Sequence, residues 1–294
     1  MANARDIKKR IKAVGNIRRI TKTMQMIATS RFAKAQQRAM ASKPYTEGIF
    51  ELVTELAAKA GNITHPLIDG PASKNPNAPE VVLVITSDRG LCGPYNGSVL
   101  RAAMSVIRAS QTLAVECMGK KGQGFFKFNR VNVAVQHANL GDKAAFAQIE
   151  ALASSYMDRF VRGEVRGVKL VYMKYISTAR QKPEVLQLLP LKPPAKIAAP
   201  GESATKGVSV EYEFSPEPGV LLGDLLPVTV KTTLWQAFND AVVSEHVARM
   251  VAMKGATDNA GKMGKLLTRK YNRARQTQIT TELTEIISGA AALE

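Results

Sequence analysis

Glycine-rich segments are the first places where this chain could do chemistry, because backbone amides at the start of a helix can bind a phosphate group. Three segments combine glycine with polar or basic residues: SDRGLCGPYN (87–96), GKKGQG (119–124) and GATDNAGKM (255–263). The first two match neither the G-x-G-x-x-G spacing of dinucleotide-binding turns nor a P-loop, and the third has Met263 where Ser or Thr would bind magnesium. We therefore interpret residues 87–96 as a structural turn between a strand and a helix, and we expect no cofactor.

Side chains that catalyse reactions or bind metals are widely separated in the sequence. His65, His137 and His246 stand neither in a metal-ligand pair nor beside a nucleophile signature. Cys92 and Cys117 have neither metal-ligand spacing nor the number needed for a disulfide framework. We expect no catalytic residue and no metal site, so the chain is predicted not to be an enzyme. Because residues far apart in sequence can converge in a fold, a nucleotide-using α/β enzyme stays an alternative.

The basic charge of the chain is concentrated at its two ends. Formal net charge is +17, from 41 Lys and Arg against 24 Asp and Glu. Residues 1–40 hold eleven basic side chains and one acidic side chain, and residues 249–275 hold eight basic side chains and one acidic side chain. The remaining residues together carry no net charge. Such segments can bind phosphates, an anionic membrane or acidic protein surfaces. A basic coiled-coil nucleic-acid-binding protein is therefore the main alternative, although no recognised DNA-binding module is present and the ends hold few aromatic residues for base stacking.

Apolar residues recur every three or four positions at both ends, which is the spacing of one helix face. The first series predicts a helix from about residue 3 to 60, which Pro44 should kink or divide, and favours a structural helix over a transit peptide. The second predicts a helix from Pro227 to the end of the sequence. Helices this long with a narrow apolar stripe need a partner helix in water, so we expect the two to pair as an antiparallel coiled coil. The apolar positions are Ile7, Ile11, Val14, Ile17, Ile20, Met24 and Ile27, then Val243, Val247, Met250, Met253, Met263, Leu266, Leu267, Tyr271, Ile279, Leu283 and Ile286.

The middle of the chain alternates strand and helix patterns, which predicts an α/β fold with a Rossmann-like central domain. The longest clean apolar run has about six residues, too few to span a bilayer. We expect an antiparallel coiled-coil shaft made of residues 1–62 and 220–294, and a central α/β domain made of residues 75–215. Strands are predicted at 81–86, 113–117, 131–135, 168–175, 185–189 and 208–214, and helices at 96–109 and 144–160.

Several segments match motifs of a known family. ITKTMQMIATSRFAKAQ (20–36) resembles the N-terminal helix of the gamma subunit of F-type ATP synthases, of the bacterial type. SEHVARMVAMKGATDN (244–259) and YNRARQTQITTELTEIISGAAAL (271–293) resemble the C-terminal helix of that family. The turn SDRGLCG with Asn96 resembles its central-domain turn, except that Pro94-Tyr95 replaces the Gly-Gly that members often carry. The similarity covers both ends and the interior of the chain.

The resemblance implies a rotor shaft without an active site of its own. In the family, the paired helices enter a ring of three alpha and three beta subunits, and the α/β domain rests on the membrane-embedded c-ring beside the epsilon subunit. Proton flow turns the c-ring and the shaft, and the beta subunits pass in sequence through states that bind, make and release ATP. The implied partners are the alpha, beta and epsilon subunits and the c-ring, not nucleic acid. Membrane association is implied only through the complex, peripherally at the cytoplasmic face of the bacterial inner membrane.

The resemblance also assigns partner contacts to particular residues. The positions that match beta-subunit contacts of the family are Met24, Arg275, Gln276, Thr280, Glu282 and Glu285. The positions that match a shorter motif at the epsilon subunit and c-ring are Glu211, Tyr212 and Glu213.

Overall fold

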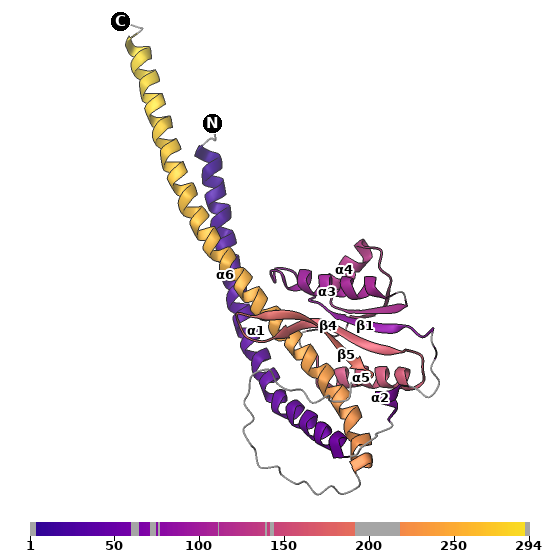
Figure 1. Ribbon diagram of the computed structural model, residues 1–294. Helices are drawn as coiled ribbons and strands as arrows, with labels where there is room; N and C mark the ends of the chain where they lie inside the picture. Colours follow the sequence, from indigo (N-terminus) through magenta and orange to yellow (C-terminus); the bar gives the residue numbers. More distant parts are fainter. Residues whose placement is uncertain are drawn as a thin grey trace. The chain divides into compact units, whose positions relative to one another are not determined.

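A computed structural model describes residues 4–59, 65–70, 75, 77–110, 112–138, 140–141, 144–191 and 218–291. The chain forms two compact units. The first consists of Met1–Arg31, Leu91–Gly93 and Val247–Glu294, and the second of Phe32–Gly90 and Pro94–His246. Two long helices, α1 (Ala4–Lys59) and α6 (Pro218–Ala291), contribute residues to both units (Figure 1).

The first unit is built on an antiparallel pair formed by the start of α1 and the end of α6. Thr257 Oγ1 donates a hydrogen bond to Thr21 Oγ1 at 2.8 Å. One turn further along α6, a Cβ at Gly261 would lie 3.6 Å from Nε of Arg18. The contact on α1 moves toward its N-terminus as α6 advances, so the helices run in opposite directions. The predicted antiparallel pairing of the two ends is confirmed.

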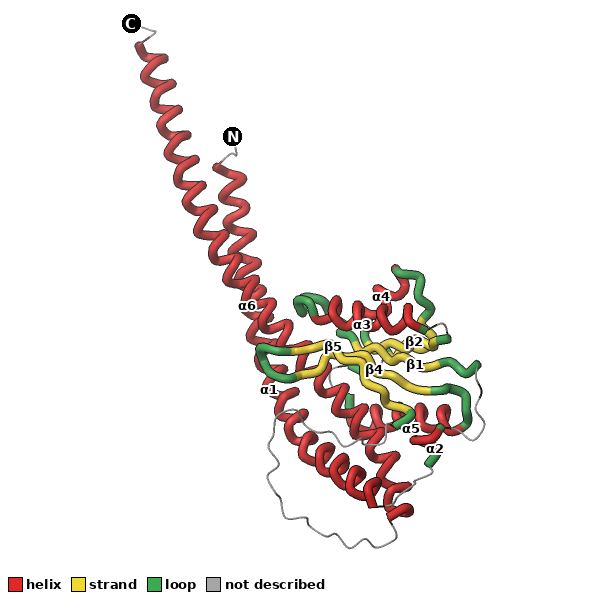
Figure 2. The backbone as a smooth tube through the Cα atoms, viewed as in Figure 1, coloured by secondary structure: helices red, strands yellow, loops and turns green. Residues whose placement is uncertain are grey.

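The second unit contains a five-stranded sheet in the order β3-β2-β1-β4-β5. The first four strands are parallel, and β5 pairs antiparallel with β4 (Figure 2). β2 and β3 are added on one side of β1, and the chain then crosses to place β4 on the other side. This is the strand order of Rossmann-type folds. The predicted α/β class is therefore confirmed. The strands are β1 (Glu80–Ile85), β2 (Leu113–Met118), β3 (Val133–His137), β4 (Gly167–Tyr175) and β5 (Gln181–Leu189).

Helices cover both faces of this sheet (Figures 1 and 2). One face carries α3 (Tyr95–Ala109) and α4 (Lys120–Phe128), and the other carries α5 (Phe146–Val161) and the short α2 (Pro66–Asp69). All six side chains of β1, EVVLVI, are buried, as expected for a parallel strand between two helical layers.

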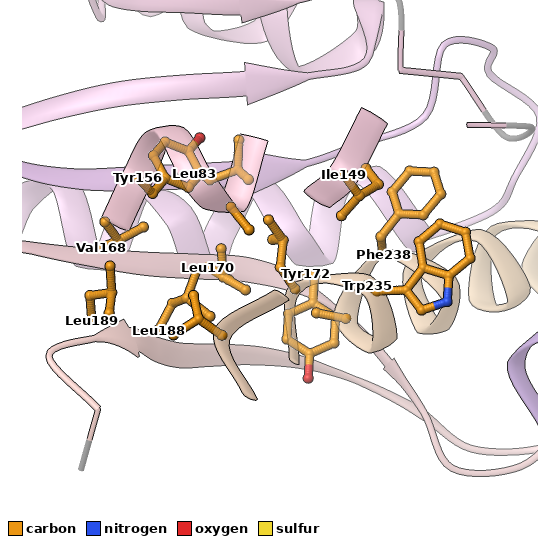
Figure 3. Packing of buried hydrophobic residues seen from close by; sticks show 14 of the residues in the cluster. Leu83, Ile149, Tyr156, Val168, Leu170, Tyr172, Leu188, Leu189, Trp235 and Phe238 are labelled. Atoms are coloured by element: carbon orange, nitrogen blue, oxygen red, sulfur yellow. The ribbon is translucent and has the colours of Figure 1, made fainter. Parts of the chain in front are cut away.

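The hydrophobic core of the second unit also includes part of α6. Trp235 and Phe238 of α6 belong to the same buried cluster as Ile149 of α5 and Tyr172 of β4 (Figure 3). Ser244 Oγ donates a hydrogen bond to the carbonyl of Met173 at 3.2 Å, which fixes α6 to β4. This segment of α6 is therefore a core element of the sheet domain as well as part of a long helix.

Pro44, which was expected to kink or divide the first helix, and Pro227, where the second was expected to begin, both lie inside helices. Pro44 does not divide α1, which is one helix of 56 residues. Met40, whose carbonyl loses its usual donor at Pro44, is exposed, so water can hydrogen-bond to that carbonyl. Pro227 lies within α6, which begins at Pro218 because Leu222 and Leu226 are already buried in the core.

Other differences concern the sheet domain. The sequence pattern did not predict α4, because Gly122 and Gly124 lower its helix propensity, yet Phe126 anchors it in the core. β5 begins four residues before the strand predicted at 185–189. β3 begins two residues after the start of the strand predicted at 131–135. The strand predicted at 208–214 lies outside the described residues.

Candidate partner-binding surfaces

The second glycine-rich segment, GKKGQG at the start of α4, uses its backbone amides in hydrogen bonds to the residues that directly follow β1. The backbone amides of residues 120–122, at the start of α4, donate to Asp88 Oδ1 at 3.1 Å, the Ser87 carbonyl at 3.1 Å and Thr86 Oγ1 at 2.9 Å. Asn96 completes the turn, since its Oδ1 accepts from the Ser87 amide at 3.0 Å. The amides of residues 120–122 are therefore already used, and the bonds between Ser87 and Asn96 link the two ends of the 87–96 segment.

Gly119 allows the two strand ends to approach in this turn. Its φ of +92° is in the region that favours glycine. A Cβ there would lie 2.7 Å from Thr86 Oγ1 and closer still to the Thr86 carbonyl oxygen. Any side chain at this position would therefore separate β1 from the start of α4.

A buried carboxylate forms the most concentrated polar cluster of the sheet domain. Glu116 on β2 is 1% exposed. Its Oε2 accepts from Tyr156 Oη at 2.7 Å and lies 2.8 Å from His137 Nε2, and its Oε1 accepts from Arg159 Nη1 at 2.8 Å. Residues from β2, β3 and α5 thus share one ion network.

The pKa values in this cluster follow from its hydrogen bonds. Burial acts to raise the pKa of Glu116, but hydrogen bonds from His137, Arg159 and Tyr156 hold it below its ordinary value. Burial and the charge of Glu116 raise the pKa of Tyr156 well above its ordinary value. The Tyr156 hydroxyl therefore stays protonated and donates its hydrogen bond to an ionised Glu116 carboxylate. Because the carboxylate oxygens are already engaged, the cluster ties elements together instead of offering a free acid or base.

The remaining candidate groups for chemistry are dispersed. His65 caps α2, where Nδ1 accepts from the Leu67 amide at 3.2 Å, and burial lowers its pKa against the opposing charge of Asp69. Burial raises the pKa of the Cys117 thiol to about 11, so it stays protonated at neutral pH. Among the described residues, no three side chains of the metal-binding types converge. Within the same residues, no helix combines the length and hydrophobicity needed to cross a membrane.

Asp240 is an acidic group on the part of α6 that lies in the core. It is 9% exposed, and Oδ1 accepts a hydrogen bond from Gln236 Nε2 at 3.1 Å. Burial raises its pKa to about 6, despite the opposing hydrogen bond from Gln236. At neutral pH the folded chain therefore holds a carboxylate whose ionisation opposes folding.

Replacing Asp240 with asparagine should stabilise the protein at pH 7.5, by on the order of 2 kcal/mol, because the amide keeps the oxygen acceptor without the charge. As the pH falls from about 6 to below 3.8, the wild-type carboxyl takes up its proton and the advantage of the variant should disappear. Urea unfolding above and below this range measures the change. The exposed Asp158 is the control, since Asp158→Asn should leave the difference between the two pH values unchanged. An Asp240→Asn effect of equal size at both pH values would contradict the prediction.

The six residues matched to beta-subunit contacts occupy two separate places on the paired helices. Met24 is half-buried on α1, one turn from the Thr21 contact with Thr257. Arg275 and the residues after it lie roughly 30 Å further along α6 than the level of Met24, at 1.5 Å per residue. The structure therefore does not bring Met24 together with the others. Glu211, Tyr212 and Glu213 lie outside the described residues.

The C-terminal set is exposed and divides between two helix faces. Gln276 and Thr280 are four residues apart on one face, and Thr280 Oγ1 donates to the Gln276 carbonyl at 2.9 Å. Arg275 and Glu282 are seven residues apart on another face, and Glu282 accepts from Gln278 Nε2 at 2.9 Å. Glu285 is exposed beyond them. All are available to a partner.

An exposed apolar stripe lies between these two faces. Its side chains are 53–70% exposed, and their spacing places them on one side of α6. Three of them were among the positions expected to pack in the coiled coil, and that expectation was wrong. It was also wrong for five positions nearer the paired region, which are 50–59% exposed: Ile17, Ile20, Ile27, Met263 and Leu266. Pairing with α1 does not reach the stripe, since Arg18 already lies opposite Gly261 and α1 begins at Ala4. The stripe consists of Ile279, Leu283, Ile286 and Ile287.

Comparison with known proteins gives consistent matches over the whole chain. A family model described as ATP synthase matches residues 3–293. The ATP synthase gamma chains of Rhodopirellula baltica and Leptospira biflexa are each 41% identical to this chain, and that of Heliobacterium modesticaldum is 36% identical, with 100% of both chains covered in every case.

Solved structures show a shared fold. A chain of the Euglena gracilis mitochondrial ATP synthase, in a structure of OSCP, F1 and c-ring, has a TM-score of 0.65 at 18% identity, covering 99% of this chain and 94% of that one. A chain from the central stalk and c-ring of the Tetrahymena thermophila mitochondrial ATP synthase has a TM-score of 0.56 at 18% identity, covering 81% and 99%.

Proposed function

Because this chain belongs to the ATP synthase gamma-chain family, we propose that it is the central rotor shaft of an F-type ATP synthase. In this role the paired helices, residues 1–62 and 220–294, turn inside a ring of alpha and beta subunits. The α/β domain, residues 75–215, is the foot on the c-ring. Rotation driven by proton flow then changes the beta subunits in sequence, and the catalytic sites belong to those subunits.

The observation that carries the proposal is the exposed end of α6. Four large apolar side chains lie uncovered along one side of a helix that α1 no longer accompanies. A solitary helix with such a stripe is only marginally stable in water unless something packs against it. A ring of subunits that closes around this end would cover the stripe at every angle of rotation, which a single fixed partner surface would not do.

The charge of the paired helices supports acidic partners. Most of the excess basic charge lies on the two helix segments of the first unit, since residues 1–31 and 247–294 together hold 17 basic and 5 acidic side chains. Exposed charges attract over several ångströms and change gradually as one surface slides past another. Acidic loops of beta subunits would therefore hold such a shaft at every angle without locking it, whereas interdigitated apolar side chains would resist rotation.

The remaining assignments follow from the same role. The chain is non-catalytic, and it contacts beta subunits through Met24 and the exposed C-terminal set, and epsilon and the c-ring through residues 211–213. It holds no cofactor and binds no nucleic acid. It is peripheral at the cytoplasmic face of the bacterial inner membrane and reaches the membrane only through the complex.

Replacing Arg275 and Gln276 together with alanine tests the proposal in the assembled enzyme. The tagged wild-type chain, expressed in bacteria that lack their own gamma chain, should recover alpha and beta subunits from membranes. The double variant should lower ATP-driven proton pumping by roughly tenfold, because charge-assisted contacts contribute about 1.5–3 kcal/mol each. Pumping is measured in inverted vesicles with a pH-sensitive dye.

The matched control is the Arg-Gln pair at the start of β5, Arg180→Ala with Gln181→Ala, which lies outside the first unit and should pump like the wild type. Wild-type pumping by the Arg275 and Gln276 variant would remove these residues from the contact set. Failure of the wild-type chain to recover alpha and beta subunits would overturn the rotor role. Tight binding to nucleic acid that falls steeply with salt would favour the alternative.

A further inference from the structure

The outer edge of the sheet at β3 is open and uncharged. β3 pairs with β2 on one side only, and no other described strand pairs with its second side. Exposed edges are usually blunted by charged residues, proline or β-bulges. Residues 131–137 read VNVAVQH and contain no lysine, arginine, acidic residue or proline, and the register of β3 against β2 shifts once, between Val133 and Val135, after which the pairing is regular to His137. Ala134 is exposed and Val135 is 41% exposed, so the described parts of the chain leave this edge accessible.

Helix α4 lies beside this edge and presents basic side chains to it. Gln136 Nε2 of β3 donates to Gln123 Oε1 of α4 at 2.7 Å, so the face of α4 that carries Gln123 adjoins the edge strand. Lys120 and Lys127 are three residues before and four after Gln123, which places them on the same face. Arg130 follows in the turn that leads into β3. We call Lys120, Lys127 and Arg130 the α4 basic stripe.

The α4 basic stripe carries more positive charge than its surroundings can balance. All three residues are exposed, and no acidic residue occurs in the sequence from 117 to 141. Glu116 is buried and engaged on the other face of the sheet, and Asp88 accepts from the backbone amide of Lys120. In the described part of the chain, the ion pairs of 4.0 Å or less join other residues. The positive charge therefore remains available to a partner.

Arg130 occupies a backbone conformation that glycine or asparagine would adopt more easily. Its φ is +56°, at the position where α4 ends and the Val131 amide donates to the Phe126 carbonyl at 2.9 Å. A left-handed residue with a long side chain is costly there, so the arginine gains nothing from the local fold. Phe128, in the last turn of α4, is 87% exposed.

We propose that the β3 edge binds an extended acidic segment of a partner protein by strand addition, with the α4 basic stripe recognising its carboxylates. Successive side chains of a strand point to opposite faces. Gln136 faces α4, whereas His137 faces Glu116 on the other side, so Val135 lies on the face of His137. The segment should therefore alternate acidic residues, on the α4 side, with apolar residues that pack beside Val135.

The charge also decides against pairing between two copies of this chain. Two β3 edges brought together would place two basic stripes close to each other, and like charges facing each other across paired strands are destabilising. An acidic extended segment satisfies both the open backbone groups and the charge.

The test uses the full chain and a blocked seven-residue peptide that alternates glutamate and valine. Binding is measured by fluorescence anisotropy and located by backbone amide exchange. The peptide should slow exchange within residues 133–137. Lys120→Glu with Lys127→Glu should weaken binding by roughly tenfold or more, because two attractive contacts become repulsive. Arg180→Glu with Lys182→Glu changes the net charge equally at the opposite edge of the sheet and should leave binding unchanged.

Arg130→Gly separates recognition from folding. It should raise the urea midpoint, because glycine relieves the left-handed backbone, and it should weaken peptide binding. Equal binding of a peptide with proline at its centre would overturn strand addition, since proline cannot pair on both sides. An equal loss of peptide binding in the Arg180→Glu, Lys182→Glu variant would overturn the assignment of the binding site to the β3 edge. Stronger slowing of exchange at 133–137 by single-stranded DNA or phosphatidylglycerol vesicles than by the peptide would assign the stripe to phosphate and overturn the acidic partner.

Discussion

Replacing Glu116 with alanine is expected to destabilise the sheet domain by about 3 kcal/mol or more. Removing one partner from a buried ion network leaves the others desolvated and unpaired, which costs about 3–5 kcal/mol. Here Tyr156, His137 and Arg159 would lose their shared acceptor. Urea unfolding followed by fluorescence of Trp235, the only tryptophan and a member of the same buried cluster as Tyr156, measures the change.

The dependence on pH identifies the charge as the cause. Because the folded pKa of Glu116 is lowered, its stabilisation is present above the unfolded value of 4.5 and is lost as the pH falls through the folded pKa. Glu116→Gln should therefore be less stable than the wild type at pH 7, and the difference should narrow below about pH 4.5. Glu150→Ala is the matched control, since it breaks only the half-exposed pair with Lys231 and should cost less than about 1 kcal/mol. Equal losses for Glu116→Ala and Glu150→Ala would contradict the role of the network.

Replacing Gly119 with alanine is expected to have a comparable effect, for a steric reason. The new Cβ would overlap Thr86, and the φ of +92° is unfavourable for alanine. Backbone strain and overpacking each cost about 1–3 kcal/mol, so we expect a loss of roughly 3–5 kcal/mol. The same urea experiment measures it.

Gly124 provides the control for this substitution. It lies inside α4, and a Cβ there would meet nothing within 4 Å. Gly124→Ala should stabilise the helix by about 0.5–1 kcal/mol, because alanine restricts the unfolded chain. If both substitutions shift the urea midpoint in the same direction, the close approach of Gly119 to Thr86 is not what makes glycine necessary.

The long helices and most of the sheet could be predicted because their patterns are local. Apolar spacing extended without interruption at both ends, and buried strands such as β1 were uniformly apolar after the first residue. What spacing could not show was where pairing stops. Leu283 and Ile286 continue the same periodicity as Val247, and only the register of Thr21 against Thr257 shows that α1 ends before reaching them.

The polar features were less accessible from the sequence. Glu116 lies 21 residues from His137 and 43 from Arg159, so no local motif links the network. Helix α4 forms although its two glycines give the segment a low helix propensity. The burial of Phe126 in the core stabilises the helix by more than the glycines destabilise it. The beta-contact residues came from the family resemblance alone and stay predictions, although the exposure of Arg275 and its neighbours is what such contacts require.

The hydrogen bonds at the start of α4 also bear on regulation. Rossmann-type sheets bind nucleotide phosphates at the first strand-to-helix turn, which here leads from β1 to α3, whereas residues 120–122 follow β2 and their amides donate to Thr86, Ser87 and Asp88. A shaft in an ATP synthase works beside sites where nucleotide levels rise and fall with metabolism. With these amides occupied by side chains and backbone of the same chain, residues 120–122 leave no free amide for a nucleotide phosphate.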